Sequence, residues 1–158
     1  MGNFYLNNTR LNKLNTGSTS GAEVANSFIF SSEFINNNVS DSEFLRIMYS
    51  TFFNRDIETD SSGKNYWSSK LNSGIARRYV FTSFVNWKEF GDICTSYNIV
   101  KGNITITDVV DRYPDITAFT YRFYSKSLDR KPDQDGPSYW ANRLVLSSGT
   151  AADMAFGF

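Results

Sequence analysis

The apolar positions along the chain follow a helical period over most of its length. In residues 21–34 and 41–54, apolar side chains recur every three or four positions, which places them on one face of an α-helix. The same spacing predicts helices over residues 3–14, 64–71, 75–90, 115–128 and 138–146, and a last one from about residue 150. The sequence therefore predicts an all-α protein of about eight helices.

Helix boundaries carry capping signals. Ser20 with Glu23, and Ser40 with Glu43, have the Ser-x-x-Glu spacing of a capping box. Gly91 is expected to end the helix over 75–90. Each signal predicts where a helix begins or ends without reference to the rest of the fold.

Residues 92–114 lack a sustained period. Residues 104–106 are expected to be extended, and residues 108–113 to form a helical turn or two. Asp115, after Pro114, is expected to cap the next helix. The segment is predicted to be a connector.

One motif occurs twice. Each copy follows an aromatic helix and consists of an Arg, an acidic loop with a Gly, and a Tyr-Trp pair that opens the next helix. The members are Arg55, Asp60, Gly63, Tyr66 and Trp67 in the first copy, and Arg130, Asp133, Gly136, Tyr139 and Trp140 in the second. A motif that recurs in one chain predicts a helical repeat of αα-hairpin units with a specialised corner.

The two copies divide the chain into repeat units. Residues 41–91 form the complete unit, and residues 20–34 match its rear part, with Phe28, Glu33 and Phe34 in the places of Phe84, Glu89 and Phe90. We therefore expect residues 1–40 to be the rear part of a preceding unit, 92–114 the connector, and 115–158 the front part of a following unit. A repeat cannot bury its apolar face alone, so the partial units are expected to pack on the complete one. Their bare edges also predict a homodimer or a domain-swapped assembly.

Composition excludes several classes of function. Sixteen basic and sixteen acidic residues cancel without long runs of one sign, so nucleic acid and anionic membranes are not expected partners. The single cysteine, Cys94, excludes an internal disulfide, and the absence of His removes the usual zinc and iron ligands. No stretch reaches the length of a membrane span and the N-terminus lacks a signal-peptide pattern. We expect a soluble chain, either cytoplasmic or a piece of a larger exported protein.

The motif resembles a bacterial family, the domain of unknown function 4214. That family's pattern is an aromatic helix, Gly-Arg-x-x-Asp, Gly-x-x-Tyr-Trp, Leu, Gly and Phe-x-x-Ser-x-Glu-Phe. The matches are Tyr49, Arg55, Asp60, Gly63, Tyr66, Trp67, Leu71, Gly74, Phe84, Glu89 and Phe90, and again Tyr124, Arg130, Asp133, Gly136, Tyr139, Trp140, Leu144 and Gly149. Two departures stand out: the first loop has two extra residues before Gly63, and Trp87 stands where the pattern, and Ser31 here, has Ser.

The resemblance implies a setting but no activity. It implies an all-helical module of secreted or surface-layer bacterial proteins, often in tandem, with a fold similar to phycobilisome linker domains. Some surface-layer relatives suggest contact with cell-surface polysaccharide. The expected function is thus a non-catalytic extracellular or cell-surface module for spacing, assembly or anchoring, through a surface glycan or another surface protein. The alternatives are a carbohydrate-binding accessory domain of a glycan-active enzyme, and a protein-protein linker.

The two arginines are predicted to be structural. Each ends a helix before an acidic loop, where its guanidinium can bond the last carbonyls and a loop carboxylate, Asp60 for Arg55 and Asp133 for Arg130. Glu33 and Glu89 are alternative partners, because each lies at the end of a unit, near where the arginine of the next unit is expected. Anion capture is the competing functional interpretation.

The loop carboxylates also suggest calcium. Asp56, Glu58 and Asp60, and Asp133 with Asp135, place hard oxygen ligands at alternate positions before a Gly. Neither loop has the distal bidentate Glu of a complete calcium loop. The competing interpretation is helix capping and Asx-turn chemistry.

The motif aromatics are candidate ligand contacts. Tyr66, Trp67, Tyr139 and Trp140 have the planar rings that stack on sugars, although their repetition favours core anchoring. Trp87 is the better candidate because it replaces a small residue; the alternative is a local core substitution. No carboxylate pair has catalytic spacing and Cys94 has no activating partner, so no enzyme activity is expected.

Overall fold

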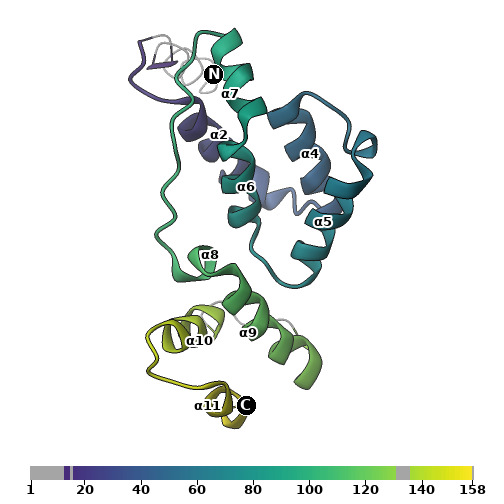
Figure 1. The fold of residues 1–158 in the computed structure, drawn as a ribbon, viewed down its shortest axis with the longest axis vertical. Helices are drawn as coiled ribbons and strands as arrows, with labels where there is room; N and C mark the ends of the chain where they lie inside the picture. Colours follow the sequence, from purple (N-terminus) through teal and green to yellow (C-terminus); the bar gives the residue numbers. More distant parts are fainter. Residues whose placement is uncertain (1–12, 15, 131–135, 158) are drawn as a thin grey trace. The chain divides into compact units, whose positions relative to one another are not determined.

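The computed structural model describes residues 13–14, 16–130 and 136–157, and these residues are helical with no β-strand, which confirms the all-α prediction. Figure 1 shows the elements: α2 (Gly21–Ile29), α3 (Ser32–Asn36), α4 (Asp41–Phe53), the 3₁₀ turn η1 (Ile57–Thr59), α5 (Ser61–Asn72), α6 (Arg77–Asn86), α7 (Lys88–Ser96), α8 (Val109–Arg112), α9 (Pro114–Ser127), α10 (Gly136–Val145) and α11 (Ala151–Phe156). The helix predicted over 3–14 lies mostly outside the described residues.

The chain divides into two compact units. The first contains residues 1–61 and Phe81–Thr105, and the second contains Ser62–Val80 and Ile106–Phe158, in each case as far as the structure describes them. The division crosses α6, so the predicted repeat over 41–91 contributes to both units. The repeat boundaries themselves stay a prediction.

An aromatic core holds the first unit together. Helix α4 buries six side chains, Phe44, Leu45, Met48, Tyr49, Phe52 and Phe53. It packs against α7, and its rings meet those of α6: Phe52 contacts Phe81 edge-on at 5.6 Å between centroids, and Phe53 stacks on Phe84 at 4.6 Å. Fully buried aromatic side chains of this kind supply most of the apolar area that drives folding.

A smaller core forms in the second unit. Tyr124 of α9, Trp140 of α10 and Met154 of α11 are buried together, with Leu128 and Leu144 partly buried against them. Helix α9 packs on α8 and α10. Pro114 occupies the first turn of α9, where its missing N–H costs no hydrogen bond. The predicted cap at Asp115 is therefore wrong by two residues, since the N-cap is Tyr113.

Two predicted helices are broken at matching places. The helix expected over 21–34 divides into α2 and α3 because Ser31 leaves the helical conformation (φ −68°, ψ 153°) and its hydroxyl accepts a bond from the N–H of Phe34. The helix expected over 75–90 divides into α6 and α7 at Trp87, which has nearly the same backbone angles (φ −70°, ψ 154°). Helical spacing of apolar residues continues across both breaks, so periodicity alone did not reveal them.

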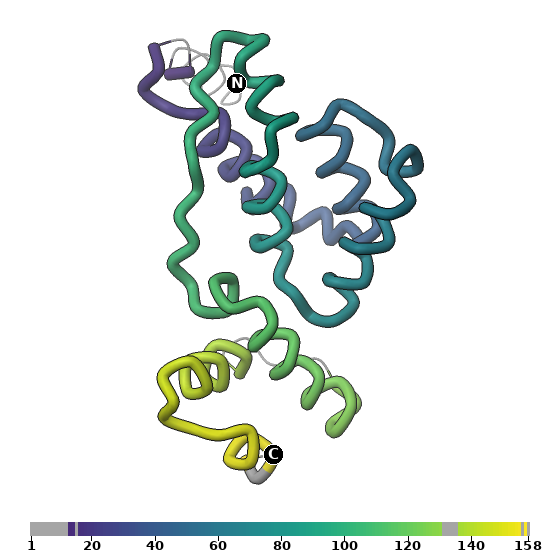
Figure 2. The backbone as a smooth tube through the Cα atoms, in the orientation of Figure 1, coloured from purple at the N-terminus to yellow at the C-terminus, as the bar shows by residue number. Residues whose placement is uncertain are grey.

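The predicted capping signals are confirmed only in part. Ser20 and Glu23 form the predicted capping box. Ser40 makes only half of one, since Glu43 pairs with Arg46 instead. Gly91 does not end a helix as predicted: α7 continues through it to Ser96, which also removes 92–96 from the predicted connector. The irregular segment before α8 is seen in Figure 2.

Candidate functional site

The first motif corner is closed around Arg55. Helix α4 ends at Asn54, whose left-handed backbone (φ 50°) turns the chain. The Arg55 guanidinium then lies 3.5 Å from Asp60 Oδ2 through Nη2 and 3.4 Å from Glu89 Oε1 through Nη1. The guanidinium thus contacts the predicted loop carboxylate, Asp60, and also Glu89, which the sequence had offered to the arginine of the following unit.

Tyr49 ties this corner to the core. Its hydroxyl donates to Asp60 Oδ2 at 3.0 Å, and the Arg55 guanidinium lies 5.5 Å from the centre of its ring. Burial raises the pKa of Tyr49 above its ordinary value, and the hydrogen bond to Asp60 raises it further. Asp60 is thereby occupied by structural contacts with two neighbouring side chains.

The second corner repeats the first where the structure describes it. Asp129 has the left-handed conformation (φ 48°) that Asn54 has, and the Arg130 guanidinium lies 5.0 Å from the Tyr124 ring centre, as Arg55 lies over Tyr49. Gly136 opens α10. The predicted partner Asp133, and Asp135, lie outside the described residues.

The two Tyr-Trp pairs have the same local geometry. Trp67 and Trp140 are buried, whereas about half of each preceding Tyr is exposed. Each pair meets edge-on at about 5 Å, and a cation four residues after the Tyr lies over its ring, Lys70 over Tyr66 and Arg143 over Tyr139. The tryptophans are therefore core side chains, and only the tyrosines present a ring to solvent.

Trp87 has a different environment from the other tryptophans. It is 40% exposed, and its ring stacks on Phe53 at 5.2 Å with 27° between the planes. It stands at the N-cap of α7 without a side-chain capping bond, whereas Ser31 caps α3 at the matching place. Compared with Ser at the matching place, Trp87 lacks the capping hydrogen bond but presents a ring in a fixed orientation at the surface.

Charged groups stand next to this ring. The Arg55 guanidinium lies 5.2 Å from the centre of the Phe53 ring on which Trp87 stacks, and it pairs with Glu89 two residues after Trp87. Both charged side chains are more than one-third exposed. We call Trp87, Phe53, Arg55 and Glu89 the Trp87 surface. It combines an aromatic plane with hydrogen-bond donors and acceptors.

Two of the predicted calcium ligands of the first loop make structural hydrogen bonds, and one of them, Asp56, is a cap. Asp56 Oδ1 accepts the N–H of Glu58 at the start of η1, and Asp60 accepts from Tyr49. Among the residues with described positions, no three Asp, Glu, His or Cys side chains gather into a group suited to a metal ion. Calcium binding stays a prediction that the structure does not test.

Cys94 lies in an apolar setting. It is buried, and burial raises the pKa of its thiol. A raised pKa keeps the thiol protonated, which is the unreactive form. This environment supplies no activation for a nucleophile.

The first unit contains an apolar pocket that the sequence did not predict. Its volume is about 450 Å³, and it is lined from α2, α3, α4 and α7 together with Leu14, Tyr97 and Ile99. The signal that the sequence offers is Ala25, a small residue at the place that Phe81 takes in the predicted complete repeat.

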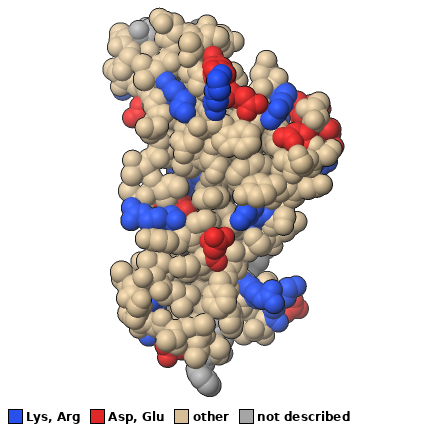
Figure 3. Space-filling view, in the orientation of Figure 1, with Lys and Arg blue, Asp and Glu red and all other residues tan. Residues whose placement is uncertain are grey.

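Basic and acidic side chains are intermixed on the face that Figure 3 shows, and no patch of one charge stands out there.

Within the described part of the chain, no helix is both long and apolar enough to cross a membrane.

Comparison with known proteins gives a family match over part of the chain and no activity. Residues 25–94 match the family model described as Domain of unknown function (DUF4214). The match runs from α2 through most of α7 and so includes the Trp87 surface and most of the pocket lining. No curated protein and no solved structure matches the chain.

Proposed function

We propose that this protein, whose residues 25–94 form a DUF4214 domain, is a non-catalytic cell-surface module that anchors or spaces by contacting a glycan through the Trp87 surface. The family resemblance favours the extracellular setting. The exposed, pre-oriented Trp87 ring is the single observation that carries the glycan contact.

The Trp87 ring suits a saccharide because its orientation is fixed before binding. Stacking on Phe53 and the 17° angle to the Phe84 ring hold its plane, so little side-chain freedom remains to be lost when a ligand arrives. The C–H face of a pyranose is apolar and packs against such a plane, whereas its hydroxyl groups need polar partners.

Arg55 and Glu89 supply those partners. A guanidinium offers N–H donors in a planar fork, and a carboxylate offers two acceptor oxygens. Their 3.4 Å pair is open to solvent, so sugar hydroxyls can replace the water around it without breaking a buried ion pair. The arrangement fits an uncharged glycan, because Arg55 is already paired with the carboxylates of Asp60 and Glu89.

The test is binding of cell-wall and surface glycans by the intact chain, measured on an array and then by titration calorimetry. In Trp87→Ser the ring is lost but the capping residue of the matching position is restored, so α7 keeps its N-terminus. We expect at least tenfold weaker binding, about 1.4 kcal/mol.

Matched controls come from the half-exposed motif tyrosines. Tyr66→Ala and Tyr139→Ala each remove an exposed ring elsewhere and should leave glycan affinity unchanged. Equal binding by the parent chain and Trp87→Ser would overturn the proposal. If a Tyr variant loses glycan binding and Trp87→Ser does not, the glycan contact lies at the Tyr-Trp pairs of the motif.

A protein-protein linker is the second candidate, because several large apolar side chains are exposed in the first unit. Phe28 is 53% and Tyr97 73% exposed. These two residues also line the apolar pocket.

A further inference from the structure

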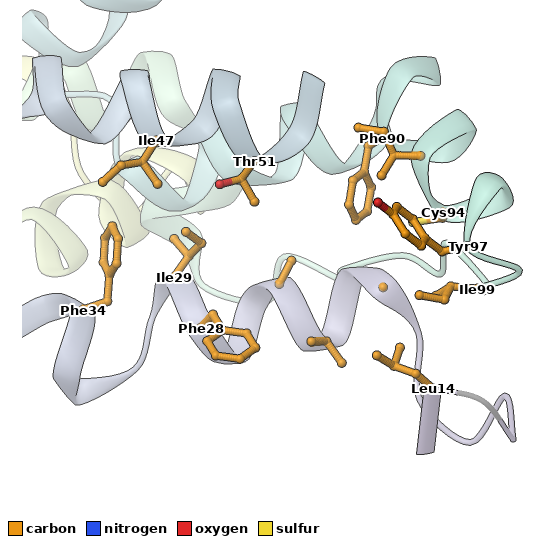
Figure 4. A pocket seen from close by; sticks show the side chains of 14 residues that line it. Leu14, Phe28, Ile29, Phe34, Ile47, Thr51, Phe90, Cys94, Tyr97 and Ile99 are labelled. Atoms are coloured by element: carbon orange, nitrogen blue, oxygen red, sulfur yellow. The ribbon is translucent and has the colours of Figure 1, made fainter. Parts of the chain in front are cut away.

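The apolar pocket is an elongated groove between helices of the first unit and is partly open to solvent. Its wall includes Gly21 and Ile29 at opposite ends of α2, which are about 12 Å apart along the helix. Ile47 and Thr51 of α4 face Ile29 and Phe34 across it, as Figure 4 shows. At about 450 Å³ the cavity has the size of ligand sites, which span roughly 300–1,000 Å³.

The difference between two matching helices explains why space is left here. On α6, Phe81 and Phe84 are fully buried against the rings of α4. At the matching places α2 carries Ala25, which lacks a ring, and Phe28, which is largely exposed. Both residues line the pocket. The space that Phe81 fills in the complete repeat is therefore not filled from α2.

The lining chemistry selects an uncharged occupant. No charged side chain is among the described lining residues, and the polar side-chain atoms are limited to Thr51, Cys94 and Tyr97. The raised pKa of the Cys94 thiol agrees with an apolar surrounding. An enclosed apolar cavity of about 150 Å³ takes up benzene. This partly open pocket has about three times that volume, which gives room for a longer hydrocarbon.

We infer that the pocket binds an aliphatic chain, such as the acyl chain of a fatty acid or lipid. The length along α2 favours a chain over a single compact ring. Phe28 and Tyr97 are exposed as well as pocket-lining, so a polar head group can stay in water while the chain is buried. This site is separate from the Trp87 surface and does not depend on the proposed glycan contact.

The test uses N-phenyl-1-naphthylamine, a neutral dye whose fluorescence rises in apolar sites, with the intact chain. We expect saturable binding and displacement by dodecanoic acid and by dodecanol. Displacement by both shows recognition of the chain itself, and displacement by the acid alone would overturn the assignment in favour of an anion site.

Two variants fill the cavity from opposite walls. Ala25→Phe introduces the residue that the matching position carries, and Thr51→Phe reaches in from α4. Each should weaken dye binding at least tenfold while the thermal unfolding midpoint stays equal or rises, because a void is replaced by packed atoms. Ile35→Ala, which removes an exposed side chain of α3 outside the lining, should bind the dye as the parent does.

Other occupants give distinct results. If the parent chain forms concentration-dependent dimers in light scattering and Phe28→Asp dissolves them, the pocket face is covered by a second copy and the inference is overturned. Unchanged dye affinity in both folded cavity-filling variants would overturn it as well.

Discussion

Helices α2–α3 and α6–α7 follow one sequence pattern and yet differ sharply in burial. Phe84 is fully buried, whereas Phe28 at the matching position is 53% exposed. The difference arises because α4 lays Tyr49, Phe52 and Phe53 against Phe84. Whether an apolar residue at such a position is buried thus depends on whether another helix covers it. The sequence around the residue does not reveal this.

The largest expected effect contrasts these two phenylalanines. Phe84→Ala should lower the free energy of unfolding by about 3–5 kcal/mol, because it opens a cavity within stacked rings. Phe28→Ala should cost less than about 1 kcal/mol, since half of the ring already contacts water. Urea unfolding followed by tryptophan fluorescence measures both. Similar losses in the two variants would show that Phe28 is covered in solution.

A middle-sized effect concerns Tyr49 of α4, whose ring contacts Phe84 and whose hydroxyl donates to Asp60. Its pKa in the folded protein is raised above the ordinary value near 10. The folded state therefore holds the phenolic proton more tightly than the unfolded state does. This contribution is complete below about pH 10 and is lost as the pH rises further, so stability should fall on the alkaline side.

Tyr49→Phe isolates that contribution. The variant should lose about 1 kcal/mol near pH 7 through the missing bond to Asp60. Above pH 10 its unfolding free energy should fall less steeply than that of the parent chain. Parallel curves for the two proteins would mean that Tyr49 does not titrate differently on unfolding.

Much of the helical architecture could be predicted from the sequence because apolar spacing and caps are local signals. The capping box of Ser20 and the end of α4 at Asn54 follow from residues within one or two turns. The breaks at Ser31 and Trp87 were missed because apolar periodicity continues through them. Trp87 gave the weaker signal of the two, since its side chain makes no capping bond.

The candidate sites were predictable only in part. Trp87 could be singled out because it departs from a repeated Ser. Burial of Trp140 depends on packing against Tyr124 of α9 and Met154 of α11, which the sequence around Trp140 does not reveal. The pocket depends on the same non-local packing, together with Ala25 in a place where a ring is needed.

The smallest expected effect compares Glu89 with Glu33, its counterpart in α3. Glu89 pairs with Arg55 at 3.4 Å, with more than one-third of each side chain exposed. A pair this exposed contributes roughly 0.5 kcal/mol or less. Glu89→Gln should therefore lower the unfolding free energy by about that amount. Glu33→Gln should lower it less, because Glu89 has Arg55 as its partner and no arginine precedes α2 among the described residues.

Salt distinguishes an ion pair from a general effect of losing a carboxylate. At 1 M NaCl the screening length falls to about 3 Å, so the difference between the two Gln variants should nearly vanish. If Glu33→Gln costs as much as Glu89→Gln at low salt, an arginine reaches Glu33 in solution. Arg130 of a second copy, which follows α9 as Arg55 follows α4, is then the residue to reverse, and Glu33→Arg combined with Arg130→Glu should restore what each single change removes.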